Sequence, residues 1–186
     1  MKKRLLADTC SAIKLATFGD RCFQKGKLSR GDIVVHPLVQ RQIKGFHPDK
    51  KKRLSQELAA LKSIRAEPNL TQSGDVFSGI QETIRLMEDQ LNIPIGRDDR
   101  QLIATALFYD DMAIITNDYK TLTPVAVSLE VTLLTAEDIV VEAVNDGLIS
   151  IEEAMDGISH WNEIGEMPNK VGVKLLKDHH LFPRET

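Results

Sequence analysis

Three aspartates lie where a folded chain exposes the partial charges of its backbone. Asp8 directly follows the apolar segment RLLA, and Asp118 lies two residues beyond the apolar segment MAIIT. Asp99 lies at the start of the helix expected to precede MAIIT. If the two apolar segments are adjacent parallel strands, the three side chains converge at the carboxyl edge of a sheet, where open parallel sheets bind their ligands.

Converging carboxylates predict a site for a divalent cation, because they repel one another unless a positive charge lies among them. Mg²⁺ and Mn²⁺ prefer oxygen ligands and keep several waters. Such ions polarise phosphoryl oxygens and lower the pKa of bound water. The chemistry expected at Asp8, Asp99 and Asp118 is therefore phosphodiester hydrolysis, with Thr116 and Asn117 orienting a water ligand.

Each aspartate also has an ordinary explanation. Asp8 could cap the helix that follows it, Asp118 could be a turn residue, and Asp99 could favour the positive end of a helix dipole. Asp98 and Gln101 fit the Asp-x-x-Gln pattern of a helix cap, which accounts for one aspartate of the doublet and leaves Asp99 free. The occurrence of all three together favours a shared site.

Strand-like segments alternate with helical ones. The expected strands are 4–8, 32–36, 112–116 and 130–135. The expected helices before residue 110 are a first one that could extend from 9 to 23, then 37–45, 48–66, 76–91 and 99–109, with 67–75 as a loop. Strands separated by helices require crossover connections and a parallel sheet. We predict a three-layer α/β/α fold with a parallel sheet of four or five strands.

The chain is expected to consist of an α/β domain, 1–135, which includes the helical segment 48–92, and a helical extension, 136–186, packed on the same domain. Thr135-x-x-Asp138 and Ser150-x-x-Glu153 resemble capping boxes, and Asn169 could cap a last helix that Gly172 weakens. The apolar residues of the extension either extend the core or dock a partner or a second copy; they are Ile139, Val140, Val144, Ile151, Met155, Ile158 and Trp161.

The charge is unevenly distributed. With a formal net charge of −3, the molecule as a whole lacks the excess of positive charge that is typical of nucleic-acid-binding proteins. A basic cluster could nevertheless border the acidic site and bind RNA, or it could be a solvated helix surface; it comprises Lys44, Lys50, Lys51 and Arg53, with His47 and Lys52 among them.

Other residue types point to ordinary roles. Cys10 and Cys22 match no zinc pattern and suit reduced thiols. His160, His179 and His180 lack the spacing of helical metal ligands, so exposed or capping roles are expected. The chain contains no apolar run of membrane-spanning length and no signal-peptide pattern, so a cytoplasmic location is expected.

Several motifs resemble the PIN-domain family. LLADTCSAIKL resembles the opening of PIN domains, in which a strand ends in Asp-Thr before an apolar helix. DRQLIATALFYDDMAIITNDYKTL resembles their second signature, and HPLVQRQI resembles the segment between the two, so that the resemblance covers residues 4–125. It implies an Mg²⁺- or Mn²⁺-dependent ribonuclease with Asp8, Asp99 and Asp118 as metal ligands. Many bacterial members are toxins inhibited by an antitoxin protein that is often DNA-binding, and homodimers are common.

One residue departs from the family pattern. Gln42 occupies the position of a further acid, and its uncharged amide should weaken metal affinity. Asp98 could compensate, or Glu57 or Glu82 could reach in from the helical segment, while Thr9 is expected to support the site. The alternative is a PIN-like protein that no longer cleaves RNA and acts as an RNA- or protein-binding module.

Overall fold

Four short apolar segments form one sheet in which every strand pairing is parallel. The computed structural model describes residues 3–64, 67, 70 and 72–182. The strand order is β2-β1-β3-β4, and the strands are β1 (Lys3–Ala7), β2 (Gly31–Val35), β3 (Met112–Ile115) and β4 (Thr132–Leu134). Ala7 lies opposite both Val35 and Ile115, so β1, β2 and β3 end together at one edge.

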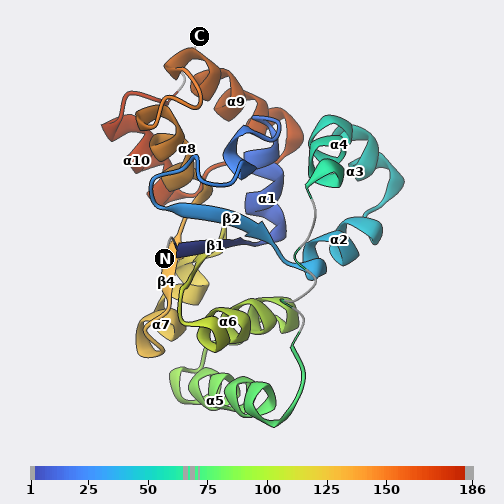
Figure 1. Cartoon of the computed structure of the whole chain (residues 1–186), viewed down its shortest axis with the longest axis vertical. Helices are drawn as coiled ribbons and strands as arrows, with labels where there is room; N and C mark the ends of the chain where they lie inside the picture. The colour runs from blue at the N-terminus through green and yellow to red at the C-terminus, as the bar shows by residue number, and fades with distance from the viewer. Residues whose placement is uncertain (1–2, 65–66, 68–69, 71, 183–186) are drawn as a thin grey trace.

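Helices cover both faces of the sheet, which confirms the predicted three-layer α/β/α fold with four parallel strands (Figure 1). Because side chains alternate along a strand, Leu5 and Ala7 point to one face and Leu6 points to the other. The hydrophobic core therefore divides into two clusters, one on each side of the sheet.

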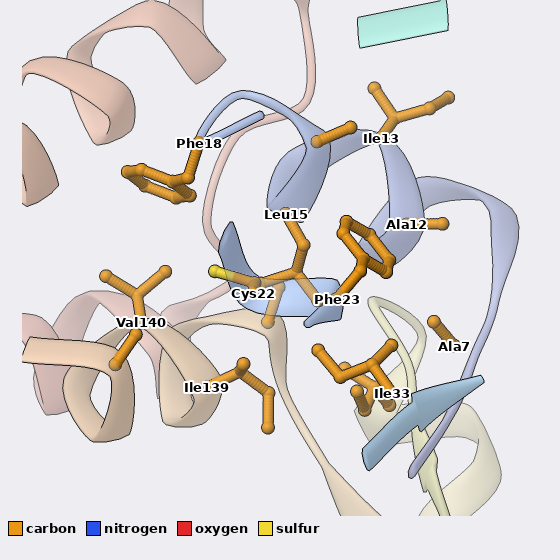
Figure 2. Close-up of a cluster of buried hydrophobic side chains, with 14 of the residues drawn as sticks. Ala7, Ala12, Ile13, Leu15, Phe18, Cys22, Phe23, Ile33, Ile139 and Val140 are labelled. Carbon is orange, nitrogen blue, oxygen red and sulfur yellow. The ribbon is translucent and has the colours of Figure 1, made fainter. Parts of the chain in front are cut away.

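The larger cluster includes residues from both ends of the chain. The helices that contribute to it include α1 (Thr9–Ala16), α4 (Ser55–Ser63), α8 (Ala136–Asn145), α9 (Ile151–Ile164) and α10 (Lys170–Asp178). In Figure 2, Leu15 of α1 lies above Ile139 and Val140 of α8, with Cys22 and Phe23 between them. Trp161 of α9 is fully buried and makes an edge-on contact with Phe18. Helices of the 136–186 segment thus share one core with the α/β domain.

The smaller cluster lies beneath the other face. It is built on Leu6, Val34 and Ile114 of the sheet. The helices on this side are α5 (Asp75–Leu91), α6 (Arg97–Tyr109) and α7 (Tyr119–Ser128). Two further helices, α2 (Pro37–Lys44) and α3 (Pro48–Arg53), follow β2 at the carboxyl end of the sheet.

The first helix is shorter than expected. It ends at Ala16 rather than Phe23, and a separate 3-10 turn, η1, covers Arg21–Phe23. Gly19 lies between the two with a φ of 69°, a left-handed conformation that ends the helical path. The thiols of Cys10 and Cys22 are both free, in line with the expectation of reduced cysteines.

Other helix boundaries also differ from the sequence prediction. The expected helix over 48–66 is two helices, α3 and α4, which meet at the fully buried Leu54, and residues 65 and 66 lie outside the described residues. Residues 68, 69 and 71 of the expected 67–75 loop also lie outside them. Helix α7 was not predicted; it contains Pro124, which interrupts its hydrogen bonding, and it is held by the burial of Leu122 and Val125.

The caps of the C-terminal helices match the prediction. Thr135 with Asp138 and Ser150 with Glu153 form complete capping boxes, and Asn169 caps α10. Of the apolar residues considered for the core, Ile139, Val140, Ile158 and Trp161 are buried in it and Val144 packs against it, whereas Met155 is half-buried outside the cluster and Ile151 is 50% exposed. None of the described helices is long and apolar enough to cross a membrane.

Candidate active site

Residues from four segments of the chain line one cavity at the carboxyl edge of the sheet. Its volume is about 330 Å³. The lining residues that the sequence singled out are Asp8, Thr9, Gln42, Asp98, Asp99, Asn117 and Asp118. Cys10, Leu38, Val39 and Leu102 complete the lining. The predicted convergence of Asp8, Asp99 and Asp118 therefore occurs, because β1 pairs directly with β3 and α6 begins beside them.

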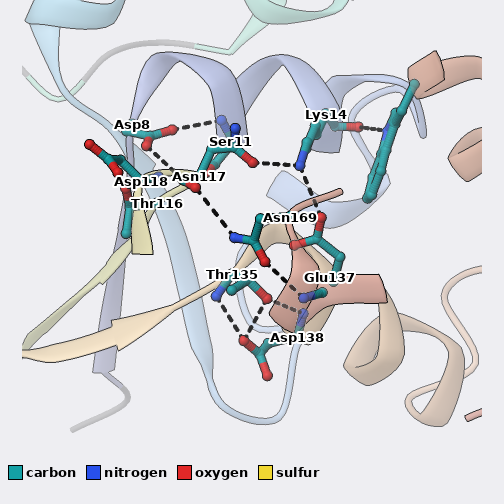
Figure 3. Close-up of polar contacts among 12 residues, drawn as sticks. Asp8, Ser11, Lys14, Thr116, Asn117, Asp118, Thr135, Glu137, Asp138 and Asn169 are labelled. Carbon is teal, nitrogen blue, oxygen red and sulfur yellow. Dashed lines mark hydrogen bonds and ion pairs between the residues drawn. The ribbon is translucent and has the colours of Figure 1, made fainter. Parts of the chain in front are cut away.

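Asp8 fixes two segments at once. Its Oδ1 atom accepts a hydrogen bond from the backbone N–H of Ser11 at 2.6 Å, so it does cap α1. Its Oδ2 atom accepts from the backbone N–H of Asn117 at 3.0 Å, across the gap between β1 and β3 (Figure 3). Capping and site formation are thus compatible roles of one side chain, and the carboxylate is held in a defined orientation.

Asp99 lies in the first turn of α6 and is affected by the other acids of the cavity. Burial, together with the negative charges of Asp8, Asp118 and Asp98, raises the pKa of Asp99 to about 6. Within the described residues, the carboxylates of Asp99 and Asp118 form no hydrogen bond and no ion pair. Two acidic groups therefore face the cavity without a compensating positive charge.

Asp118 is exposed and is positioned through its backbone. Its N–H donates to the hydroxyl oxygen of Thr116 at 3.0 Å, and Thr116 is fully buried. Thr116 does not line the cavity. It was expected to orient a ligand water, but its hydroxyl instead holds the backbone of the loop that carries Asp118.

Gln42 lies between Thr9 and Asp98. The Thr9 hydroxyl donates to Gln42 Oε1, and Gln42 Nε2 donates to Asp98 Oδ2 at 2.5 Å. Asp98 was expected to cap α6, which is wrong: Gly96 is the N-cap, and Asp98 lies inside the first turn. The amide therefore occupies the cavity wall next to a carboxylate.

A buried ion pair supports the loop between β3 and α7. Lys14 Nζ donates to Asn117 Oδ1 at 2.7 Å and pairs with Glu137 Oε1 at 2.9 Å, and neither Lys14 nor Glu137 is exposed to solvent (Figure 3). From the start of α10, Asn169 Nδ2 donates to the backbone oxygen of Asn117 at 3.3 Å. Sequence reasoning missed Lys14 and Glu137. The one available signal was a lysine between Ile13 and Leu15 on a helix whose other faces are apolar.

The predicted basic residues lie near the site but do not line it. Lys44 ends α2, the helix that carries Gln42, while Lys50, Lys51 and Arg53 belong to α3. Lys51 Nζ donates to the backbone oxygen of Lys44 at 2.8 Å. Lys50 is paired at 3.5 Å with Glu166, a buried acid that also affects the cavity residue Cys10.

Other proposed contributors lie elsewhere. Glu57 is buried against His160 Nε2 at 2.9 Å, and Glu82 is an exposed partner of Arg85, so neither lines the cavity. His179 and His180 are exposed, as expected. Burial, together with negative neighbours that include Asp8, raises the pKa of the Cys10 thiol to about 12, so this thiol is protonated at neutral pH.

The donor set suits a hard cation in chemical type, because it consists of carboxylate and amide oxygens. Asp99 and Asp118 have unpaired carboxylates, which a cation could bind. Burial and the neighbouring acids raise the pKa of Asp99, and a bound cation would offset the repulsion between these acids. Across the described part of the chain, however, no three His, Cys, Asp or Glu side chains are grouped as a ready-made metal centre. Binding would therefore require the carboxylates to draw closer together.

No model of a known protein family matches the chain, and no curated protein is significantly similar to it in sequence.

Proposed function

We propose that this protein is an Mg²⁺- or Mn²⁺-dependent endoribonuclease that hydrolyses RNA phosphodiester bonds. The observation that supports this best is that Asp8, Asp98, Asp99 and Asp118 line a single cavity, to which no Lys or Arg of the described residues contributes. An accumulation of negative charge without a local cation is unfavourable in a folded protein and is relieved by a bound metal ion.

Asp8, Asp99 and Asp118 would hold the metal ion, which supplies Lewis-acid activation of the phosphoryl group and of a bound water. Asp8 is the rigid member, since two backbone N–H groups fix its oxygens. Gln42 presents an amide in place of a fourth charge, and Asp98, to which it donates, remains the nearest additional acid.

The resemblance of residues 4–125 to PIN domains supports RNA as the substrate class. The basic residues of α2 and α3 would attract the RNA backbone toward the cavity. The same resemblance favours a more specific form of this proposal. In that form the protein is a cytoplasmic, homodimeric toxin that an antitoxin-like partner protein inhibits.

The test is cleavage of end-labelled RNA by the purified protein in Mn²⁺, with and without a chelator. Asp8→Asn and Asp99→Asn should each abolish chelator-sensitive cleavage. Asp156→Asn is the matched control, because Asp156 is an exposed aspartate of α9 outside the cavity. Cleavage that persists in both cavity variants, or that ignores the chelator, would rule out the proposal.

A PIN-like binding module without catalytic activity is the second candidate. It is favoured by Gln42 at the position of an acid and by the lack of a pre-formed metal centre among the described residues. RNA binding that is insensitive to metal and to Asp99→Asn, without any cleavage, would support the module over the enzyme.

A further inference from the structure

A second cavity lies on the other side of the helical turn that carries Asp99. It is formed between α5 and α6 and has a volume of about 550 Å³. Three arginines contribute to its lining, Arg85, Arg97 and Arg100, whereas no aspartate or glutamate within the described part of the chain does. We call it the arginine cavity. Its charge is opposite to that of the cavity lined by Asp8, Asp98, Asp99 and Asp118, which we call the carboxylate cavity.

Two of the three arginines are available to an external anion. Arg97 is exposed and forms no hydrogen bond or ion pair within the described residues. Arg85 pairs only with Glu82 at 3.3 Å, in a surface pair whose side chains are both 60% exposed, and such pairs are weak. Arg100, by contrast, is held by Glu88 at 2.7 Å and serves as a fixed part of the wall.

The floor of this cavity is held by a contact between the two helices. Gln81 of α5 donates to Gln101 Oε1 of α6 at 2.9 Å. Gln101 lies one helical turn beyond Arg97, so the same contact fixes the helix surface on which Arg97 stands. The cavity therefore combines a fixed polar contact between its two helices with one unpaired guanidinium, Arg97, and one that is only weakly paired, Arg85.

The two cavities lie on opposite faces of α6. Asp98, Asp99 and Leu102 line the carboxylate cavity, whereas Arg97, Arg100 and Gln101 line the arginine cavity. A helix with its side chains is roughly 10–12 Å wide, and an RNA strand must pass around it. At about 3.4 Å of rise per nucleotide along one strand, the strand needs at least about three nucleotides to reach from one cavity to the other.

We propose that the arginine cavity binds a backbone phosphate of the RNA strand whose scissile phosphate lies in the carboxylate cavity. Guanidinium groups bind phosphate oxygens through paired, charge-assisted hydrogen bonds, and a cavity of this size accepts a nucleotide. This inference rests on the proposed function. It adds a subsite at least about three nucleotides from the reacting bond and makes substrate length a determinant of affinity.

The experiment compares a 12-nucleotide RNA with a dinucleotide, both with a cleavage-resistant backbone, each measured for affinity to the Mn²⁺-loaded protein, in which the carboxylate cavity can hold a phosphate. Arg97→Ala should weaken binding of the 12-mer about tenfold, and Arg85→Ala with Arg97→Ala should weaken it further. Each arginine removed should also lower the dependence of log Kd on log salt by about one. Dinucleotide affinity should not change, because one phosphate cannot occupy both cavities.

Two variants serve as controls. Lys27→Ala removes one exposed positive charge at the amino end of β2, where Gly26 contacts Asp32, and it should leave 12-mer affinity unchanged. Arg97→Lys keeps the charge but loses the paired geometry, so it should recover the salt dependence and only part of the affinity. Thermal unfolding verifies that each variant is folded.

The outcomes separate this inference from the proposed function. An equal loss for both RNAs, a loss no larger than that of Lys27→Ala, or equal competition by an acidic peptide of the same charge would overturn the subsite. If cleavage is chelator-sensitive but Arg97→Ala leaves the 12-mer affinity unchanged, the proposed nuclease function is supported and the subsite is ruled out. If the arginine substitutions weaken RNA binding but no cleavage occurs, the subsite is supported and the nuclease function is ruled out.

Discussion

Lys14 and Glu137 form an ion pair inside the protein, with 2.9 Å between Nζ and Oε1 and with side-chain exposures of 0% and 1%. A buried pair of this kind gains little over an apolar replacement, because both charges lose their hydration. Its local consequence is structural: Lys14 also donates to Asn117, whose backbone N–H holds Asp8. The pair thus connects α8 to the candidate active site.

Removing one member of this pair should be far more damaging than removing both. Glu137→Gln leaves the buried charge of Lys14 without a counter-charge and should lower the free energy of unfolding by about 3–5 kcal/mol. Lys14→Met combined with Glu137→Leu should cost clearly less than Glu137→Gln alone. Urea unfolding of the three proteins measures this, and a double variant as unstable as the single one would contradict it.

Gln42→Glu should strengthen metal binding and weaken the metal-free protein. A carboxylate at this position adds a fourth negative oxygen ligand, but it also replaces the N–H that Gln42 donates to Asp98. We expect a lower Mn²⁺ concentration at half-maximal cleavage, together with a lower Tm in chelator. Unchanged metal dependence would show that residue 42 does not contact the metal.

Asp99→Asn should stabilise the metal-free protein in a pH-dependent manner. Asp99 binds its proton more tightly in the folded protein, with a pKa of about 6 against 3.8 in the unfolded chain. The free energy of unfolding therefore falls as the pH rises from about 4 to about 6, by about 1.4 kcal/mol per pKa unit at most, and stays low above pH 6. Asparagine does not titrate, so the variant should avoid this loss.

The measurement is Tm in chelator at pH 4 and pH 7.5. The variant should be more stable than the wild type at pH 7.5, and its advantage should shrink toward pH 4, where Asp99 is largely protonated. Added Mn²⁺ should raise the Tm of the wild type at pH 7.5 but not that of the variant. A variant that is less stable at pH 7.5 would show that Asp99 is not repelled by its neighbours.

Two glycines in helices should respond oppositely to alanine. A Cβ at Gly157 of α9 would lie 2.3 Å from a ring carbon of Phe18, which is buried against Trp161, so Gly157→Ala should cost about 1–3 kcal/mol. Gly79 of α5 has open space around it, so Gly79→Ala should add about 0.5–1 kcal/mol. Urea unfolding compares them, and equal effects would contradict the packing of α9 on Phe18.

The sheet and the acidic residues were predictable because their signals are local. Apolar runs marked all four strands to within two residues at each end, and their alternation with helices implied parallel pairing. Once β1 and β3 are neighbours, the convergence of Asp8 and Asp118 follows from geometry alone. The capping boxes at Thr135 and Ser150 were likewise legible, because every atom involved lies within three residues.

Contacts between distant segments were not predictable. Lys14 on an apolar helix looks like an error until Glu137 is placed beside it, 123 residues away. Gly172 seemed to weaken the last helix, yet a Cβ there would lie 2.5 Å from the carboxyl carbon of Glu137, so glycine is needed for α10 to pack on α8. Tertiary packing outweighs local propensity at such positions.

The loop that carries Asp118 is held by residues that are translated after it, and this affects the order in which the fold can form during synthesis. Its supports at Glu137 and Asn169 are translated after every residue of the acidic cavity. A nascent chain that has emerged from the ribosome only as far as β4 already possesses all the acids, but nothing yet anchors Asn117 from the side of α8 and α10. If the chain is the proposed ribonuclease, this order would delay its activity until α10 has been synthesised.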